Sequence, residues 1–302
     1  MTFTPGEIRQ IFYGHFEHDA AMTVREIHQG AMNFSYEIER DGKNYILKAY
    51  PPARYYMADR EFDLLKKTAR VLPHQIPEVH FSGSFNNFSY IIYEKIPGHT
   101  LVFDQLSSKN KEIVSSRIAY NLTKLFELKF EIFGSLCEEE PTFLSWEDFL
   151  FENIRIGMIE LKLANIFDIE QLEKLEKFMT GCLDNWPDTD YGFVWSDFNQ
   201  GNIIINNEEL VGFIDFESCF YGDVLLSLGY LFAREGESEF FLSMENQLRA
   251  FVNIDRSYIY FYAFLRLLRI SKYLSQPLSN GKPREPVWDY FKGIGTAMDA
   301  IF

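Results

Sequence analysis

Three polar residues lie close together in the stretch VWSDFNQGNIIINNEELVGFIDFE, which runs from residue 194 to residue 217. They are Asp197, Asn202 and Asp215. An Asn oxygen and an Asp carboxylate are hard ligands of the kind that Mg²⁺ prefers. A second carboxylate on a loop beside such a metal is free to accept a proton. The pattern therefore indicates phosphoryl transfer, with Asn202 and Asp215 as metal ligands and Asp197 as the base.

A short hairpin would bring these residues together. The run IIIN at 203–206 is typical of a strand, NNEE at 206–209 of a turn, and LVGFID at 210–215 of the return strand. An antiparallel return places Asp215 close to Asn202. The alternative is that each residue is an isolated turn or cap residue.

A lysine and a glutamate upstream form a second candidate pair. Lys48 interrupts the strand-like run YILKAY, and Glu61 follows 13 residues later in the helical stretch DREFDLL. A strand lysine held by a helix carboxylate can direct its ammonium at the α- and β-phosphates of a nucleotide. The alternative for each residue is an ordinary position at the protein surface.

The turn QGAMN at 29–33 is a weaker candidate for a phosphate contact. It contains Gly30 and ends with Asn33 before a strand-like run. Backbone N–H groups of such a turn can bind phosphate oxygens. A plain hairpin turn is the alternative.

The elements that must position these residues change character near Pro97 and Gly98, a turn signal. Before it, alternating patterns predict strands at 21–28, 34–40, 44–50, 77–83 and 88–96, with one helix at 57–72. After it, amphipathic patterns predict helices at 109–130, 145–164 (with Ser145 as N-cap), 168–186 and 257–274. We therefore expect an α+β protein with a nucleotide-binding lobe at 1–97 and a helical lobe at 98–302. Clefts between such lobes are preferred ligand sites.

Composition restricts the partners. The 302 residues carry a formal charge of −15, which argues against nucleic acid and anionic membranes as partners. No apolar run is long enough to span a membrane, and no signal peptide is recognisable. The three cysteines show no paired or metal-ligand spacing, which is typical of a reducing compartment. The sequence thus predicts a cytoplasmic protein.

Taken together, these residues resemble the aminoglycoside phosphotransferase and choline kinase family of small-molecule kinases. That family carries His-Gly-Asp-x4-Asn, then Ile-Asp-Phe or Ile-Asp-x-Gly, then Gly-Asp-Pro and an Asp-Leu-Ala helix. This chain has WSDFNQGN, IDFE and GDVLLSLGYL, with QGAMNFSYEI and EKIPG upstream, in order over about residues 25–235. The resemblance implies a protein-kinase-like fold of two lobes, with a β-rich N-terminal lobe and a mostly helical C-terminal lobe that contains the catalytic hairpin.

The resemblance also implies roles at matching positions. Asp197 corresponds to the catalytic base, Asn202 and Asp215 to Mg²⁺ ligands, and ATP or GTP to the phosphate donor. The remaining positions would bind the nucleotide: Lys48 and Glu61, Gly30 and Asn33 of the turn, the backbone of Glu94 and Ile96, and Tyr93 at the back of the base pocket. The bulk of Tyr93 leads us to expect a preference for guanine over adenine.

Several positions depart from the family pattern. Trp195 replaces the family His, Ser196 the Gly and Ser227 the helix Asp; Val224 and Phe126 also differ. We therefore expect the catalytic loop to be held by packing in place of the hydrogen bond of that His.

The chemical class of the molecule that accepts the phosphate is predicted only from the charge of nearby residues. Acidic residues after the hairpin could line a pocket for a small cationic acceptor such as an aminoglycoside, which would make the protein an antibiotic-resistance enzyme. They are Asp223, Glu235, Glu237 and Glu239. Two alternatives remain. One is a metabolic kinase for choline, homoserine, a sugar or a fructosamine-like acceptor, and the other is a degenerate relative that binds nucleotide without catalysis.

Overall fold

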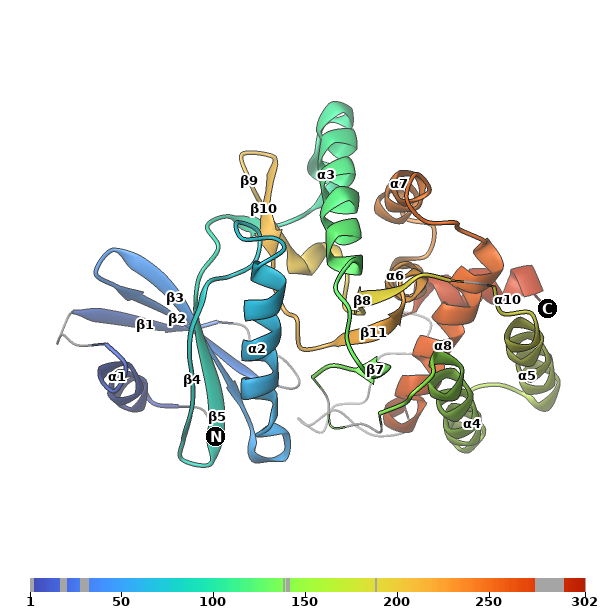
Figure 1. Ribbon diagram of the computed structural model, residues 1–302, viewed down its shortest axis with the longest axis horizontal. Coiled ribbons are helices and arrows are strands. Elements are labelled where there is room, and N and C mark those ends of the chain that lie inside the picture. Colours follow the sequence, from blue (N-terminus) through green and yellow to red (C-terminus); the bar gives the residue numbers. More distant parts are fainter. Residues whose placement is uncertain are drawn as a thin grey trace.

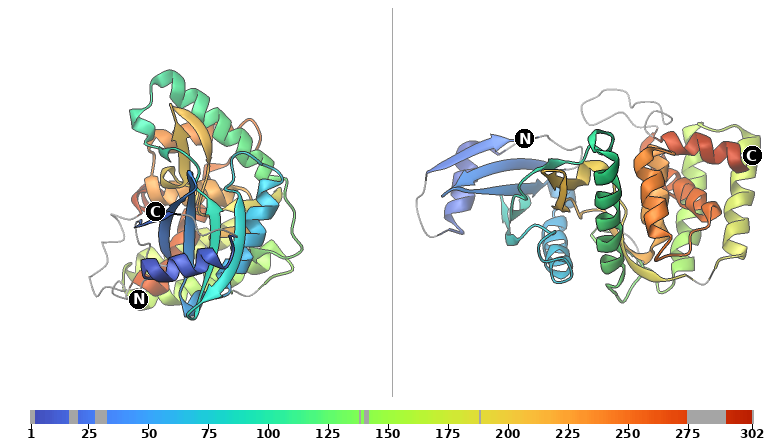
Figure 2. Two further views of the ribbon diagram at one scale, coloured as in Figure 1. Left: turned by 90° about the vertical axis from the view of Figure 1, so that its left-hand side faces the viewer. Right: turned by 90° about the horizontal axis from the view of Figure 1, so that it is seen from above.

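The structure is a computed structural model that describes residues 3–16, 21–27, 33–137, 139, 142–187, 189–274 and 291–301. An antiparallel sheet occupies one end of an elongated molecule, and helices occupy the other end (Figures 1 and 2). This is the α+β, two-lobe arrangement expected from the sequence. The boundary between residues 97 and 98 stays a prediction. Among the described residues, no helix is both long and apolar enough to cross a membrane.

The N-terminal sheet has the strand order β1-β2-β3-β5-β4. Its strands are β1 (Met22–Glu26), β2 (Phe34–Arg40), β3 (Lys43–Tyr50), β4 (Val79–Phe85) and β5 (Phe88–Glu94). Asp41 and Gly42 join β2 to β3, with positive φ angles of 52° and 73°. Two such residues in sequence suit the tight hairpin that the DG pair predicts.

Helices cover both faces of this sheet. Helix α1 (Pro5–Tyr13) packs Ile8 and Phe12 against one face, and α2 (Met57–Ala69) packs Leu64 and Leu65 against the other. Helix α1, which the sequence patterns did not predict, begins at a capping box formed by Thr4 and Glu7. The core beneath α2 continues without a break into the helical lobe.

The helical lobe is built around α8 (Arg256–Leu274), which packs against α4 and α6. Its other α-helices within the described residues are α3 (Ser108–Phe126), α4 (Trp146–Ala164), α5 (Ile169–Asp184), α6 (Leu225–Glu235), α7 (Glu239–Leu248) and α10 (Lys292–Ile301). The predicted cap at Ser145 is present, since its hydroxyl accepts a hydrogen bond from the Asp148 N–H at 3.1 Å.

Two small sheets contain or flank the segment that carries Asp197, Asn202 and Asp215. The predicted hairpin consists of β9 (Ile203–Asn206) and β10 (Glu209–Phe213), and β6 (His99–Thr100) pairs with β9. The other sheet was not predicted and joins β7 (Gly134–Ser135), β11 (Cys219–Asp223) and β8 (Tyr191–Trp195) in that order. Gly98 precedes β6, and there φ is +140° and an added Cβ would lie 2.4 Å from the Ile205 carbonyl oxygen. Only glycine suits that approach.

Candidate active site

Lys48 lies on β3 with its ammonium among three carboxylates. Its Nζ is 3.1 Å from Glu61 Oε2 on α2 and 2.7 Å from Asp215 Oδ1 after the hairpin. A third carboxylate oxygen, Glu217 Oε2, lies 3.1 Å away. Lys48 and Glu61 are both buried, and the Tyr50 hydroxyl donates a hydrogen bond to Glu61. The structure therefore forms the expected strand–helix pair and links it to the end of the hairpin.

The carboxylates around Lys48 leave an excess of negative charge. Burial works against the charge of Lys48, but Asp215, Glu217 and Glu61 outweigh it and raise the pKa of the lysine well above its usual value. Desolvation raises the pKa of Asp215 to about 6, with Glu217 and Glu61 adding to the rise against the opposing effect of Lys48. The carboxylate still keeps 34% of its side-chain surface exposed. A divalent cation beside Asp215 would relieve this repulsion.

Glu217 was missed by the sequence analysis, although it lies two residues after Asp215. Asn33 donates a hydrogen bond from Nδ2 to Glu217 Oε2 at 2.8 Å, and Arg54 lies 3.7 Å from Oε1. Asn33, predicted as part of a phosphate-binding turn, thus contacts the lysine cluster, which consists of Lys48 and the carboxylates of Glu61, Asp215 and Glu217. Gly30 of the same turn lies outside the described residues.

The hairpin brings Asn202 beside the segment that carries Asp215. The Ile214 N–H donates to the Asn202 carbonyl oxygen at 2.9 Å. The Asn202 side chain donates from Nδ2 to Asp197 Oδ2 at 2.8 Å, which fixes the orientation of the amide and of its oxygen Oδ1. Asp215 itself has a φ of 65°, a left-handed conformation that costs energy outside glycine.

The side-chain oxygens of Asn202 and Asp215 are suitable ligands for Mg²⁺. Nowhere in the described ranges do three or more His, Cys, Asp or Glu residues form a group that could hold a metal ion. The candidate set is therefore one amide oxygen, from Asn202, and one carboxylate, from Asp215. Mg²⁺ uses such a small set of hard protein ligands and completes its shell with water and phosphate oxygens.

A cleft of about 670 Å³ opens beside these residues. The predicted residues that line it are Asn33, Lys48, Tyr93, Ile96, Asn202 and Asp215. Glu94 contributes differently, because its N–H donates to the Glu78 carbonyl at 2.9 Å and its side chain pairs with Lys43 at 2.6 Å. Any base contact from the Glu94 backbone must come from its carbonyl oxygen.

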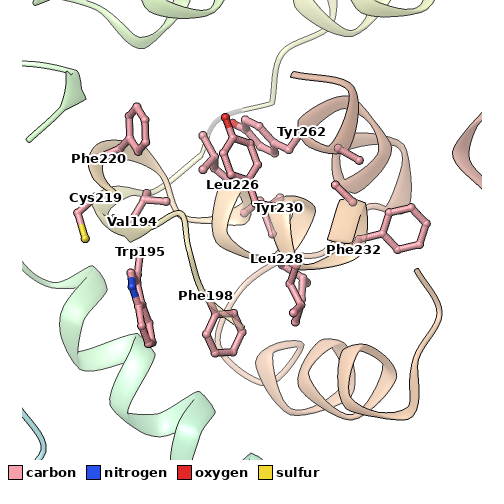
Figure 3. Packing of buried hydrophobic residues seen from close by; sticks show 14 of the residues in the cluster. Val194, Trp195, Phe198, Cys219, Phe220, Leu226, Leu228, Tyr230, Phe232 and Tyr262 are labelled. Atoms are coloured by element: carbon pink, nitrogen blue, oxygen red, sulfur yellow. The ribbon is translucent and has the colours of Figure 1, made fainter. Parts of the chain in front are cut away.

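Trp195 holds the catalytic loop by packing and also by a hydrogen bond. Its buried indole stacks on Phe216, with ring centroids 5.2 Å apart and planes inclined by 6°. Its side chain and that of Phe198 extend in the same direction, away from Phe220 (Figure 3). The indole Nε1–H also donates to the Asp215 carbonyl oxygen at 3.0 Å. The packing expected from the sequence is therefore present, and the indole adds a hydrogen bond of its own that was not predicted.

The two serine departures behave differently. Ser196 donates from its hydroxyl to the Ser218 carbonyl oxygen at 2.6 Å, which ties the loop to the start of β11. Ser227 is buried in α6, and its hydroxyl has no hydrogen-bond partner among the residues described. Only Ser196 therefore contributes to the position of Asp197.

Two arginines beside Asp197 were also missed. Arg266 of α8 donates to the Ser196 carbonyl oxygen at 2.8 Å and to Asp197 Oδ1 at 3.5 Å. Arg234 near the end of α6 lies 3.6 Å from the same carboxylate oxygen. The sequence offered only one signal, an arginine within the apolar run FLRLL.

The four acidic residues expected to line a pocket for a cationic acceptor are buried or already have partners in the described part of the chain. Asp223 is buried, and burial raises its pKa to about 6. The other three carboxylates already have partners: Glu235 accepts from Gln200 and Ser238, Glu237 pairs with Arg256, and Glu239 pairs with Lys111.

Solved structures share this fold. The crystal structure of aminoglycoside phosphotransferase APH(4)-Ia superposes with a TM-score of 0.70 at 16% identity, covering 99% of this chain and 98% of that one. A thermostable mutant of APH(4)-Ia, in a ternary complex with AMP-PNP and hygromycin B, gives 0.67 at 18% identity over 98% and 97% of the two chains. A protein assigned as a fructosamine-3-kinase, from Haemophilus somnus 129PT, gives 0.69 at 15% identity over 98% and 97%.

No curated protein matches this sequence. One family model does, over residues 23–261, a span that contains Lys48, Asp197, Asn202, Asp215 and Arg234, whereas Arg266 lies just beyond it. The chain therefore belongs to the phosphotransferase enzyme family described by that model.

Proposed function

We propose that the protein transfers the γ-phosphate of ATP or GTP to a hydroxyl group of a small molecule and requires Mg²⁺. The observation that carries the proposal is the position of Lys48. It shares one cleft with Asn202 and Asp215, and Asn202 is bonded in turn to Asp197. This joins a phosphate-binding cation, two metal ligands and a base in one network.

Each residue has a distinct role in this proposal. Lys48 binds the α- and β-phosphates, and Glu61 holds its ammonium in place. Asn202 and Asp215 would hold Mg²⁺, which supplies neutralisation of charge on the phosphate oxygens. The acceptor oxygen forms its bond to the γ-phosphorus, the bond to the bridging β–γ oxygen breaks, and the hydroxyl proton passes to Asp197. Positioning and electrostatics provide most of the rate.

The nucleotide occupies the cleft between the proposed lobes, residues 1–97 and 98–302. The complex of the APH(4)-Ia mutant with AMP-PNP supports a nucleoside triphosphate as donor. Tyr93 lines the same cleft, and we infer that its bulk favours guanine. Assays with ATP and GTP side by side test this, and equal turnover or an ATP preference would remove the inference.

Two of the solved structures with this fold support two classes of acceptor. Hygromycin B in one complex supports an aminoglycoside-like acceptor, and the fructosamine-3-kinase likeness supports a metabolic alcohol as the second candidate. The intact Lys48–Glu61 pair, at 3.1 Å, weighs against a degenerate protein.

A screen of acceptors for consumption of ATP and GTP tests the function. Asp197→Ala should lower turnover by ~10²-fold or more, as expected for the loss of an acid–base group, while nucleotide binding persists. Asp184→Ala, at an exposed position at the end of α5, is the matched control and should match the wild type. Turnover of Asp197→Ala at the wild-type rate would end the assignment of the base.

A further inference from the structure

Two guanidinium groups flank the candidate base. Arg234 and Arg266 both approach Asp197 Oδ1, at 3.6 Å and 3.5 Å. One carboxylate balances only one of these two charges. Glu235, next to Arg234 in sequence, is bonded to the neutral side chains of Gln200 and Ser238, and it forms no ion pair with either arginine within the described residues. The two guanidinium groups thus share one carboxylate, Asp197, in a protein whose formal charge is −15.

This positive charge lies away from the nucleotide side of Asp197. The other carboxylate oxygen, Oδ2, accepts the hydrogen bond from Asn202, which lines the nucleotide cleft. Neither Arg234 nor Arg266 lines that cleft. Both come from helices of the helical lobe and approach Oδ1, the oxygen that the Asn202 side chain does not bind.

The two arginines are held differently. Arg266 is only 14% exposed, is bonded to the Ser196 carbonyl oxygen, and lies over the Tyr230 ring at 4.8 Å from its centroid. It is a positioning residue for the loop. Arg234 is 40% exposed, and its contact with Asp197 at 3.6 Å is longer than a hydrogen bond. Asp197 is its one ion-pair partner in the described part of the chain, so its planar set of N–H donors remains open to a ligand.

We propose that Arg234 binds an anionic group, a carboxylate or a phosphate, of the acceptor whose hydroxyl is phosphorylated at Asp197. This inference rests on the proposed kinase function and specifies its substrate class. A guanidinium matches the paired oxygens of either anion. A hydroxyl bonded to Asp197 and an anionic oxygen bonded to Arg234 can lie at most about 9 Å apart, given ordinary hydrogen-bond lengths. A polyammonium acceptor would instead meet repulsion at this point.

The test uses acceptors in matched pairs and the full-length protein. In the first series, the two members of a pair carry the same primary alcohol, one with a carboxylate and the other with the corresponding neutral amide. In the second series, one member carries a phosphate and the other the neutral methyl ester of that phosphate. Hydroxyl-bearing aminoglycosides form the cationic arm. Product is measured as phosphorylated acceptor by mass spectrometry, beside total release of nucleoside diphosphate. The two series distinguish a carboxylate from a phosphate as the group recognised.

The wild type should favour the anionic member of each pair. Arg234→Gln should raise KM for that member by roughly 10- to 100-fold, as for the loss of a charged hydrogen bond, and leave KM for the neutral member within about twofold. Arg234→Lys should recover part of the difference. The matched control is Arg117→Gln, an exposed arginine of α3 with a similarly long ion pair of 3.8 Å, which should change nothing.

Other outcomes overturn the inference in distinguishable ways. Preferred phosphorylation of aminoglycosides, with KM unchanged by Arg234→Gln, would refute the anionic acceptor and leave the kinase function intact. An equal fall in kcat for all acceptors and for acceptor-independent hydrolysis would assign Arg234 to the transferred phosphoryl group instead. Failure to bind nucleotide or to phosphorylate any acceptor would overturn both proposals.

Discussion

Replacement of Trp195 by phenylalanine would test how the catalytic loop is held. The change removes the indole Nε1–H that donates to the Asp215 carbonyl oxygen at 3.0 Å. A buried carbonyl left without its donor costs about 1–3 kcal/mol. The missing ring atoms leave roughly 40 Å³ of space, which adds about 1 kcal/mol. We therefore expect Trp195→Phe to lower the free energy of unfolding by about 2–4 kcal/mol.

The same change should also weaken binding of the Mg²⁺–nucleotide complex. Asp215 adopts a φ of 65°, and the bond from Trp195 to its carbonyl helps to hold that conformation. A left-handed residue costs roughly 1–2 kcal/mol, so release of this restraint should weaken binding by about 5- to 30-fold. Urea unfolding and titration calorimetry with Mg²⁺ and nucleotide measure the two effects.

Trp146→Phe provides the matched control. Trp146 is also buried, and its Nε1–H donates to the Tyr262 hydroxyl at 3.0 Å, away from the cleft. It should lose a similar amount of stability and keep its affinity for Mg²⁺–nucleotide. If Trp195→Phe and Trp146→Phe weaken binding equally, or if neither does, the proposed link between Trp195 and Asp215 is refuted.

Three further predictions concern charged groups. Lys48→Met should abolish nucleotide binding, measured by calorimetry. It should also lower the free energy of unfolding by about 3–5 kcal/mol, because three carboxylates lose the cation that they share. Unchanged nucleotide binding would contradict the role of Lys48 as a phosphate ligand. Arg266→Lys should lower kcat about 10-fold and leave KM for nucleotide unchanged, because a lysine lacks the planar guanidinium that donates to both the Ser196 carbonyl oxygen and Asp197. A change in KM alone would count against this positioning role. Asp223 has a folded pKa of about 6, above its unfolded value, so its stabilising contribution is complete below pH ~4 and is lost as pH rises through ~6. Asp223→Asn should reduce the difference in unfolding free energy between pH 4 and pH 7.5 by about 3 kcal/mol, and an unchanged difference would exclude this titration.

Local patterns predicted the parts of the site that neighbouring strands and helices create. The hairpin turn at 206–209 was enough to bring Asn202 and Asp215 to one edge, and the strand–helix spacing was enough to pair Lys48 with Glu61. These arrangements depend on periodicity and turns, which short stretches of sequence record.

Contacts between distant segments could not be predicted in this way. Arg266 lies 69 residues from Asp197 in the chain, and helical periodicity shows only which face of α8 it occupies. The pairing of β8 with β11 depends on the same tertiary packing. The sequence showed the charges of Glu237 and Glu239 but not the distant Arg256 and Lys111 that pair with them.

The indole of Trp195 has a consequence for the response of the loop to acidity. A histidine in this position would change its charge near neutral pH, whereas an indole has no proton to gain or lose in that range. Its contacts with Phe216 and with the Asp215 carbonyl therefore persist unchanged across physiological pH. The two contacts by which Trp195 holds the loop therefore do not depend on pH in this range, whereas the Asp215 carboxylate beside them can change its charge.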